Sequence, residues 1–308
     1  MRTREQKQEQ FKEWLLDHPG HLKTNFNTLA VRFDLSYNEV KEIVSEVRAE
    51  LFGAERRKDL FRVANTVKVA TKNYFENTFT VKPFIGGDVN NVLIIGDTHI
   101  PFERDGYMEH CRKVQEQFNC GTVVHIGDVI DNNYSSYHET NPDGISAGDE
   151  LELAVARLQK WYYTFPNVKV CLGNHDQIIQ RKAYSSGLSK RWIKGLAEVL
   201  QVPDWDFNLE HQIKGVIYSH GTGTSGDKAA FTRALNRRRS IVSGHLHTTA
   251  GITWNVSDVD RIFAMQVGCG IDDTKYSFDY AKTFSKKSIV SCGVVLDGKL
   301  PIIIPMEL

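Results

Sequence analysis

The 308-residue sequence has no excess of charge of either sign. Its 38 Lys and Arg residues balance 38 Asp and Glu residues, so the formal net charge is zero. A neutral chain exerts no general attraction on nucleic acid or on an acidic membrane surface. Any affinity for such partners must therefore come from a local patch.

Long apolar runs and closely spaced cysteines are also missing. No segment reaches the roughly 18 apolar residues of a membrane span, and the first residues contain no apolar core of a secretory signal. The five cysteines are odd in number and none has the C-x-x-C spacing of zinc and redox motifs. These absences predict reduced thiols and a cytoplasmic protein without a membrane partner.

The composition, with 41% hydrophobic and 25% charged residues, is that of a globular protein with an ordinary core. The length allows one large domain and one small domain. The pattern of apolar residues changes near residue 88, which predicts a helical domain with a connector over residues 1–87 and an α/β domain over residues 88–308.

Three helices are predicted in the first domain. Apolar residues recur at helical spacing over Arg4–His18 and over Asn27–Phe33. Ser36, with Glu39 three residues later, forms the capping box of a third helix. Helix, short helix, turn and longer helix is the layout of a helix-turn-helix module.

The charges of the third helix leave its partner open. Carboxylates repel phosphates, so an acidic face opposes contact with DNA. A DNA partner and a protein partner therefore both remain open for this domain. The charged positions after Ser36 are mostly acidic: Glu39, Glu42, Glu46 and Glu50, against Lys41 and Arg48.

Strands and helices alternate in the second domain, which predicts a parallel sheet covered by helices. Helical stretches are expected over Gln177–Tyr184 and Leu188–Leu200. After Gln212 short strands dominate, and they are expected to form a second sheet that packs on the first. These strands include Ile289–Leu296 and Ile302–Ile304.

Polar residues with metal-binding side chains follow five apolar strands. Ligands of open α/β sheets bind at the carboxyl ends of strands, so these side chains are expected to meet at one edge. Asp97 and His99, like His245 and His247, are spaced i, i+2, which puts both side chains of each pair on one side of an extended chain. The five segments are Val92–His99, Val123–Asp131, Val168–Asp176, Val216–His220 and Ile241–His247.

The donor set predicts a centre with two divalent metal ions. There are too many Asp, Asn and His donors for one tetrahedral site, but enough for two adjacent cations that activate a water and hold a phosphoryl group. Such oxygen and nitrogen donors favour Mn over Fe, Zn, Ni or Mg, and they disfavour soft copper.

The five motifs in this order resemble those of the calcineurin-like metallophosphoesterase superfamily, over residues 90–270. The resemblance implies an α/β fold, a four-layer α/β/β/α sandwich, here preceded by the small all-α helix-turn-helix-like domain. It also implies that Asp128 bridges two metals. The implied ligands are Asp97, His99 and His247 for the first metal, and Asn174, His220 and His245 for the second.

The resemblance leaves His175 off the metals. It implies that His175 protonates the leaving oxygen and that Asp131 holds the His175 imidazole in its working tautomer. Many relatives have Arg after this Asp, and this sequence has Asn132. Arg181 or the Arg237–Arg239 run is a candidate replacement.

We predict a phosphodiesterase or nuclease that acts on nucleic acid or nucleotides. The sequence is similar to phage-encoded and bacterial members that carry an N-terminal helical module, which implies a bacterial cytoplasm or that of a phage-infected host. The alternatives are a phosphomonoesterase, acting on protein or small molecules, and a DNA-binding regulator whose metal site is structural.

Overall fold

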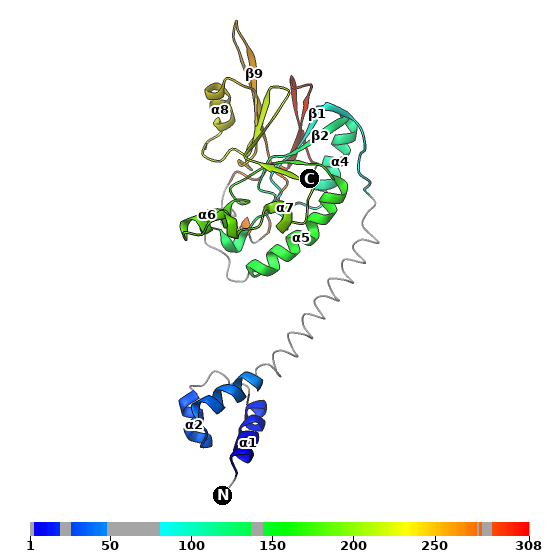
Figure 1. The fold of residues 1–308 in the computed structure, drawn as a ribbon. Coiled ribbons are helices and arrows are strands. Elements are labelled where there is room, and N and C mark those ends of the chain that lie inside the picture. The colour runs from blue at the N-terminus through cyan, green and yellow to red at the C-terminus, as the bar shows by residue number, and fades with distance from the viewer. Residues whose placement is uncertain are drawn as a thin grey trace. The chain divides into compact units, whose positions relative to one another are not determined.

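The fold is described from a computed structural model, which covers residues 3–18, 26–47, 81–136, 144–275, 277–278 and 285–307. The chain folds into two compact units, Met1–Thr78 and Phe79–Leu308 (Figure 1). No helix within these ranges is long and apolar enough to cross a membrane.

The N-terminal unit is helical, as predicted. It contains α1 (Arg4–Asp17), α2 (Phe26–Phe33) and a helix over residues 37–47. The predicted capping box is confirmed, because the Ser36 amide donates to Glu39 Oε2 at 2.8 Å and the Glu39 amide donates to Ser36 Oγ at 3.4 Å. The three helices bury one apolar core: Phe11, Leu15, Leu29, Val40, Ile43, Val44 and Val47.

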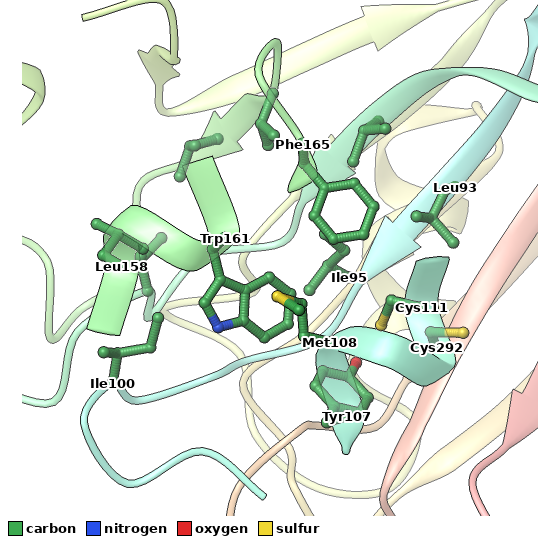
Figure 2. Packing of buried hydrophobic residues seen from close by; sticks show 14 of the residues in the cluster. Leu93, Ile95, Ile100, Tyr107, Met108, Cys111, Leu158, Trp161, Phe165 and Cys292 are labelled. Atoms are coloured by element: carbon green, nitrogen blue, oxygen red, sulfur yellow. The ribbon is translucent and has the colours of Figure 1, made fainter. Parts of the chain in front are cut away.

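The first sheet of the second unit contains four parallel strands and two antiparallel ones. Its strand order is β11-β10-β1-β2-β3-β4. Helices α4 (Tyr107–Gln117) and α5 (Ala147–Thr164) pack on it, and the side chains of Trp161 and Phe165 point toward Ile95 (Figure 2). The strands are β1 (Asp88–Ile95), β2 (Cys120–His125), β3 (Lys169–Cys171), β4 (Asp206–Asn208), β10 (Ser291–Leu296) and β11 (Leu300–Pro305).

The second sheet has the order β5-β6-β7-β9-β8. Helix α8 (Ala229–Arg237) covers its outer face through Ala230 and Ala234. A separate apolar core, which includes Ile94, Tyr218 and Met265, lies between the two sheets. These cores confirm the predicted α/β/β/α layers. The strands are β5 (Glu210–Ile213), β6 (Val216–Ser219), β7 (Ile241–Ser243), β8 (Ala250–Val256) and β9 (Arg261–Val267).

Two expectations about this unit are wrong. The strands expected over Ile289–Leu296 and Ile302–Ile304 belong to the first sheet, because β10 pairs antiparallel with β1 and β11 pairs with β10. The helix expected over Leu188–Leu200 is instead a 3-10 turn, η3 (Lys190–Trp192), followed by the short α7 (Leu196–Val199). Gly195, in an extended conformation, separates the two turns.

Candidate metal centre

The predicted donor residues meet at the carboxyl ends of the strands of both sheets. Asp97, Asp128 and Asn174 follow the parallel strands β1, β2 and β3. His220 and His245 follow β6 and β7, which are also parallel. The structure therefore brings side chains that are far apart in sequence into one buried polar cluster.

The first group of donors consists of Asp97, His99 and His247, whose ligand atoms all lie within 4.8 Å of one another. His247 Nε2 is 3.2 Å from Asp97 Oδ2. Asp97 and His99 are buried, and His247 is partly exposed. Asp97 Oδ2 also accepts a hydrogen bond from the His245 amide at 2.8 Å, which ties the ends of β1 and β7 together.

The second group is centred on His220 Nε2. This atom is 3.0 Å from Asn174 Oδ1, 3.2 Å from His245 Nδ1 and 3.1 Å from Asp128 Oδ2. His220 Nδ1 is 3.1 Å from the carbonyl of Ile126, which only accepts, so the ring proton belongs on Nδ1. Nε2 is then the atom that would offer a lone pair to a bound cation, beside Asn174 Oδ1, His245 Nδ1 and Asp128 Oδ2.

Asp128 faces both groups. Its Oδ2 atom is 3.1 Å from His220 Nε2 and 3.6 Å from His99 Nε2. Its Oδ1 atom accepts a hydrogen bond from the His175 amide at 2.8 Å. Burial raises the pKa of the Asp128 carboxyl, but the neighbouring His220, His175 and His99 imidazoles outweigh it and hold that pKa well below its usual range.

The chemistry of these donors fits two divalent cations. Asp97 Oδ1 and His99 Nε2 are buried and have no hydrogen-bond partner. His99 Nδ1 is held at 2.6 Å by Asp131 Oδ1, so the proton belongs on Nδ1 and Nε2 offers its lone pair to the site. Buried acceptors that face one another without a donor require a cation to offset their repulsion.

Glycines allow the strand ends to approach so closely. A Cβ atom on Gly173 would lie 2.0 Å from Asp128 Oδ1, and one on Gly244 would lie 2.2 Å from Asp97 Oδ1. Both positions therefore exclude any side chain. The glycine in each of these strand-end motifs makes room for a carboxylate that comes from another strand.

Three of the candidate ligands have left-handed backbone conformations. The φ angles are 47° at His99, 49° at Asp128 and 72° at His245. Such conformations are costly for residues other than glycine, and they persist at sites where the surrounding structure enforces them. Here the turns aim the side chains back toward the sheet edge.

Asp176 has a role that the sequence did not reveal. Its buried carboxylate accepts hydrogen bonds from the amides of Asp128, Val129 and Gly173 at 2.9, 3.0 and 2.9 Å. It thus joins the loop after β2 to the loop after β3. Its place as the last residue of Gly-Asn-His-Asp was the only signal in the sequence.

The surroundings of His175 differ from the expectation. The Asp131 carboxylate is 2.6 Å from His99 Nδ1 but 3.5 Å from His175 Nδ1. The backbone carbonyl of Asp131 is instead the hydrogen-bond partner of His175 Nδ1. Asn132 Nδ2 donates to the His175 carbonyl at 3.1 Å, which fixes the loop. The backbone of Asp131 therefore orients His175, while its side chain orients His99.

The pKa of His175 is raised above its ordinary value. Burial lowers this pKa, but the charges of Asp128 and Asp131 and the hydrogen bond to the Asp131 carbonyl raise it by more. The ring is partly exposed, with 19% of the side chain accessible. The protonated imidazole is therefore favoured at a position that solvent and a substrate can reach.

Two of the residues considered as replacements for an Arg at the position of Asn132 are engaged elsewhere. Arg237 forms two hydrogen bonds with Glu210, both at 3.0 Å, and Arg238 pairs with Asp260 at 2.9 Å. Arg237 and Arg238 thus tie the C-terminal end of α8 to the second sheet and to the turn between β8 and β9.

Comparisons with solved structures give distant fold matches. An archaeal phosphodiesterase is 14% identical, with a TM-score of 0.38, over 70% of this chain and 99% of that one. The phosphoesterase Yfce from E. coli is 16% identical, with a TM-score of 0.35, over 66% of this chain and 87% of that one. The nuclease MPE from Pseudomonas putida is 11% identical, with a TM-score of 0.35, over 70% of this chain and 86% of that one.

The family is shown by comparison of the sequence with family models. No curated protein matches the chain. The model of the calcineurin-like phosphoesterase family matches residues 91–264, more than half of the chain and the segment that carries all the candidate ligands. The chain therefore belongs to the calcineurin-like phosphoesterase family and is a phosphoester hydrolase.

Proposed function

We propose that this hydrolase cleaves phosphodiesters of nucleic acid or nucleotides at a centre of two divalent cations. The observation that carries the proposal is the position of Asp128, whose Oδ2 atom faces His220 of one group and His99 of the other. A carboxylate oxygen shared in this way suits a bridge between two cations.

The seven candidate ligands of the metal centre would divide between the two cations in the same way as the two donor groups. Asp97, His99 and His247 would hold the first, and the group around His220 would hold the second, with Asp128 in both. When bound, the two cations supply a water of lowered pKa and positive charge beside the phosphoryl oxygens. Mn²⁺ suits this mixture of carboxylate, amide and imidazole donors, and Fe, Zn, Ni or Mg are alternatives.

His175 would act on the leaving group. Its Nδ1 atom is engaged by the Asp131 carbonyl, so Nε2 is the atom left to serve the substrate. Because the pKa of His175 is raised, the ring carries a proton that it can deliver to the departing oxygen. The Asp131 carboxylate contributes through His99, whose tautomer it sets.

The environment of Asn132 favours a diester over a monoester. A phosphate diester carries one negative charge, and a monoester carries up to two. Asn132 donates to the His175 carbonyl, so it supplies no cation for a second charge. Two of the four candidate arginines, Arg237 and Arg238, supply none either, because both pair with carboxylates.

The N-terminal unit would serve as a tether to nucleic acid or to a protein partner. Two of its acidic residues are neutralised within the unit: Glu39 Oε1 is 2.7 Å from Arg4 Nε, and Glu46 is 3.5 Å from Lys12 Nζ. Part of the repulsion expected against phosphates is thereby removed. The unit supplies none of the candidate ligands.

Hydrolysis of two small substrates tests the proposal. With Mn²⁺, bis-(p-nitrophenyl) phosphate should be cleaved faster than p-nitrophenyl phosphate. The Asp128→Asn variant should lose this activity and most of its bound metal in elemental analysis. The exposed Asp258→Asn variant is the matched control and should behave like the parent protein. A preference for the monoester would contradict the diester assignment, and full metal content with normal turnover in Asp128→Asn would contradict the bridging role.

A further inference from the structure

A basic segment begins directly after the candidate metal centre. Between Asp176 and Glu198 the sequence contains no acidic residue and five basic ones. Lys194 pairs with Glu198 at 2.6 Å. In a chain with no net charge, this segment is a local concentration of positive charge. The basic residues are Arg181, Lys182, Lys190, Arg191 and Lys194.

Two aromatic rings lie between these cations and are open to solvent. Tyr184 and Trp192 are each 83% exposed, more than any other aromatic residue that the structure describes. Leu188, between them in sequence, is 55% exposed. Exposed apolar groups that cluster in this way mark an interaction surface. Their alternation with Lys and Arg is typical of surfaces on which the bases of a single strand stack.

The segment is held firmly against the site. Ile178, the first residue of α6 (Ile178–Ser185), is buried and its amide donates to the His175 carbonyl at 3.2 Å. Ala183 is buried too, and its carbonyl accepts from the Leu188 amide at 2.8 Å. Helix α6, which carries the exposed Tyr184, contacts η3, which carries the exposed Trp192. Helix α6 lies at the margin of the second unit (Figure 1).

The surface is close enough to the metal centre to guide a substrate. Tyr184 lies six residues after Ile178 along α6, which corresponds to about 9 Å at 1.5 Å per residue. The first turn of the helix is bonded to His175, the proposed proton donor. A nucleic acid strand that stacks on Tyr184 therefore has its neighbouring phosphates near the site.

We propose that the surface formed by α6 and η3 binds single-stranded nucleic acid and directs it to the metal centre, an inference that rests on the proposed phosphodiesterase function. Tyr184 and Trp192 would stack on unpaired bases, and Lys190 and Arg191 would bind the phosphates. A duplex hides the faces of its bases within the stack, so the rings cannot use them. The partner is therefore a single strand.

Binding of labelled oligonucleotides to the full chain tests the proposal. Fluorescence anisotropy with a thymidine oligonucleotide, in the presence of EDTA, measures affinity without cleavage. Tyr184→Ala and Trp192→Ala should each weaken binding about 10-fold, because each removes one stacked base. In the double variant Lys190→Gln/Arg191→Gln, the slope of log binding constant against log salt concentration should become shallower by about 1.4. This is roughly 0.7 for each of the two phosphates that no longer has a cation beside it. Matched controls are Trp254→Ala, a partly exposed indole on β8, and Arg239→Gln, an exposed cation after α8.

The outcomes separate this proposal from the proposed function. All the variants on this surface should hydrolyse bis-(p-nitrophenyl) phosphate like the parent protein, since that substrate does not reach the surface. Unchanged oligonucleotide affinity in the aromatic variants would overturn the proposal, even if diester hydrolysis is intact. Equal losses on a duplex of the same sequence would overturn the stacking role, and losses confined to anionic phospholipid vesicles would assign the surface to a membrane. Absence of diester hydrolysis together with the expected losses in strand binding would instead overturn the proposed function alone.

Discussion

The substitution Gly173→Ala probes how the strand ends pack around the proposed bridging carboxylate. The new methyl group would lie 2.0 Å from Asp128 Oδ1 and 2.3 Å from the Asp128 amide nitrogen. Real Cβ atoms essentially never approach other heavy atoms below 3.0 Å. The carboxylate must therefore move by about 1 Å, the difference between 2.0 and 3.0 Å, and a misplacement of about 1 Å in a catalytic site costs on the order of 10²-fold in rate.

The assay combines turnover, metal content and thermal stability. Gly173→Ala should lose about 100-fold in kcat on bis-(p-nitrophenyl) phosphate with Mn²⁺, and elemental analysis should show reduced metal. Gly148→Ala is the matched control, because its methyl group would meet nothing closer than Ser146 Oγ at 3.9 Å. In the first turn of α5, that change should keep full activity and raise stability by up to about 1 kcal/mol.

One result would refute this reasoning directly. If Gly173→Ala keeps both the kcat and the metal content of the parent protein, the glycine does not make room for Asp128 as inferred. A loss of stability with normal turnover per bound metal would show that the clash is relieved elsewhere in the fold.

Three further predictions follow from the site and from the N-terminal unit. His175→Ala should keep its metal stoichiometry but lose about 10²–10⁴-fold in turnover, with a smaller loss on p-nitrophenyl esters than on alkyl esters, and equal losses on both would contradict the acid role. Removal of residues 1–78 should leave hydrolysis of the small diester unchanged, whereas salt-sensitive binding to duplex DNA should weaken if DNA is the partner of this unit. The hydrogen bond from Arg4, followed by those from Ser36, lowers the pKa of Glu39 from its ordinary value of 4.5. The ionised Glu39 therefore stabilises the fold fully at neutral pH, and this stabilisation is lost as the pH falls below 4.5 and the carboxylate becomes protonated. Glu39→Gln should accordingly lower the calorimetric Tm at pH 7. If the difference in Tm between this variant and the parent protein is as large in acid as at pH 7, the reasoning is contradicted.

Local patterns in the sequence predicted most of the elements, although the helix expected over Leu188–Leu200 is interrupted. Helical spacing and the Ser36 capping box predicted the helices of the first unit, because such patterns act within one or two turns of a helix. Strands that end in Gly-Asp or Gly-His predicted the cluster, because the carboxyl ends of parallel strands meet at one edge of a sheet. Strand ends that lie far apart in sequence do converge there.

Only the tertiary structure decided which partner each group takes. The Asp131 carboxylate lies on His99 and not on His175, and the Asp176 carboxylate joins two loops through their amides. Likewise, β10 pairs with β1 although its sequence pattern is that of any buried strand. Side-chain type specifies what a residue is able to bind, but left-handed turns such as the one at Asp128, and the packing of distant strands, determine which atoms come within reach.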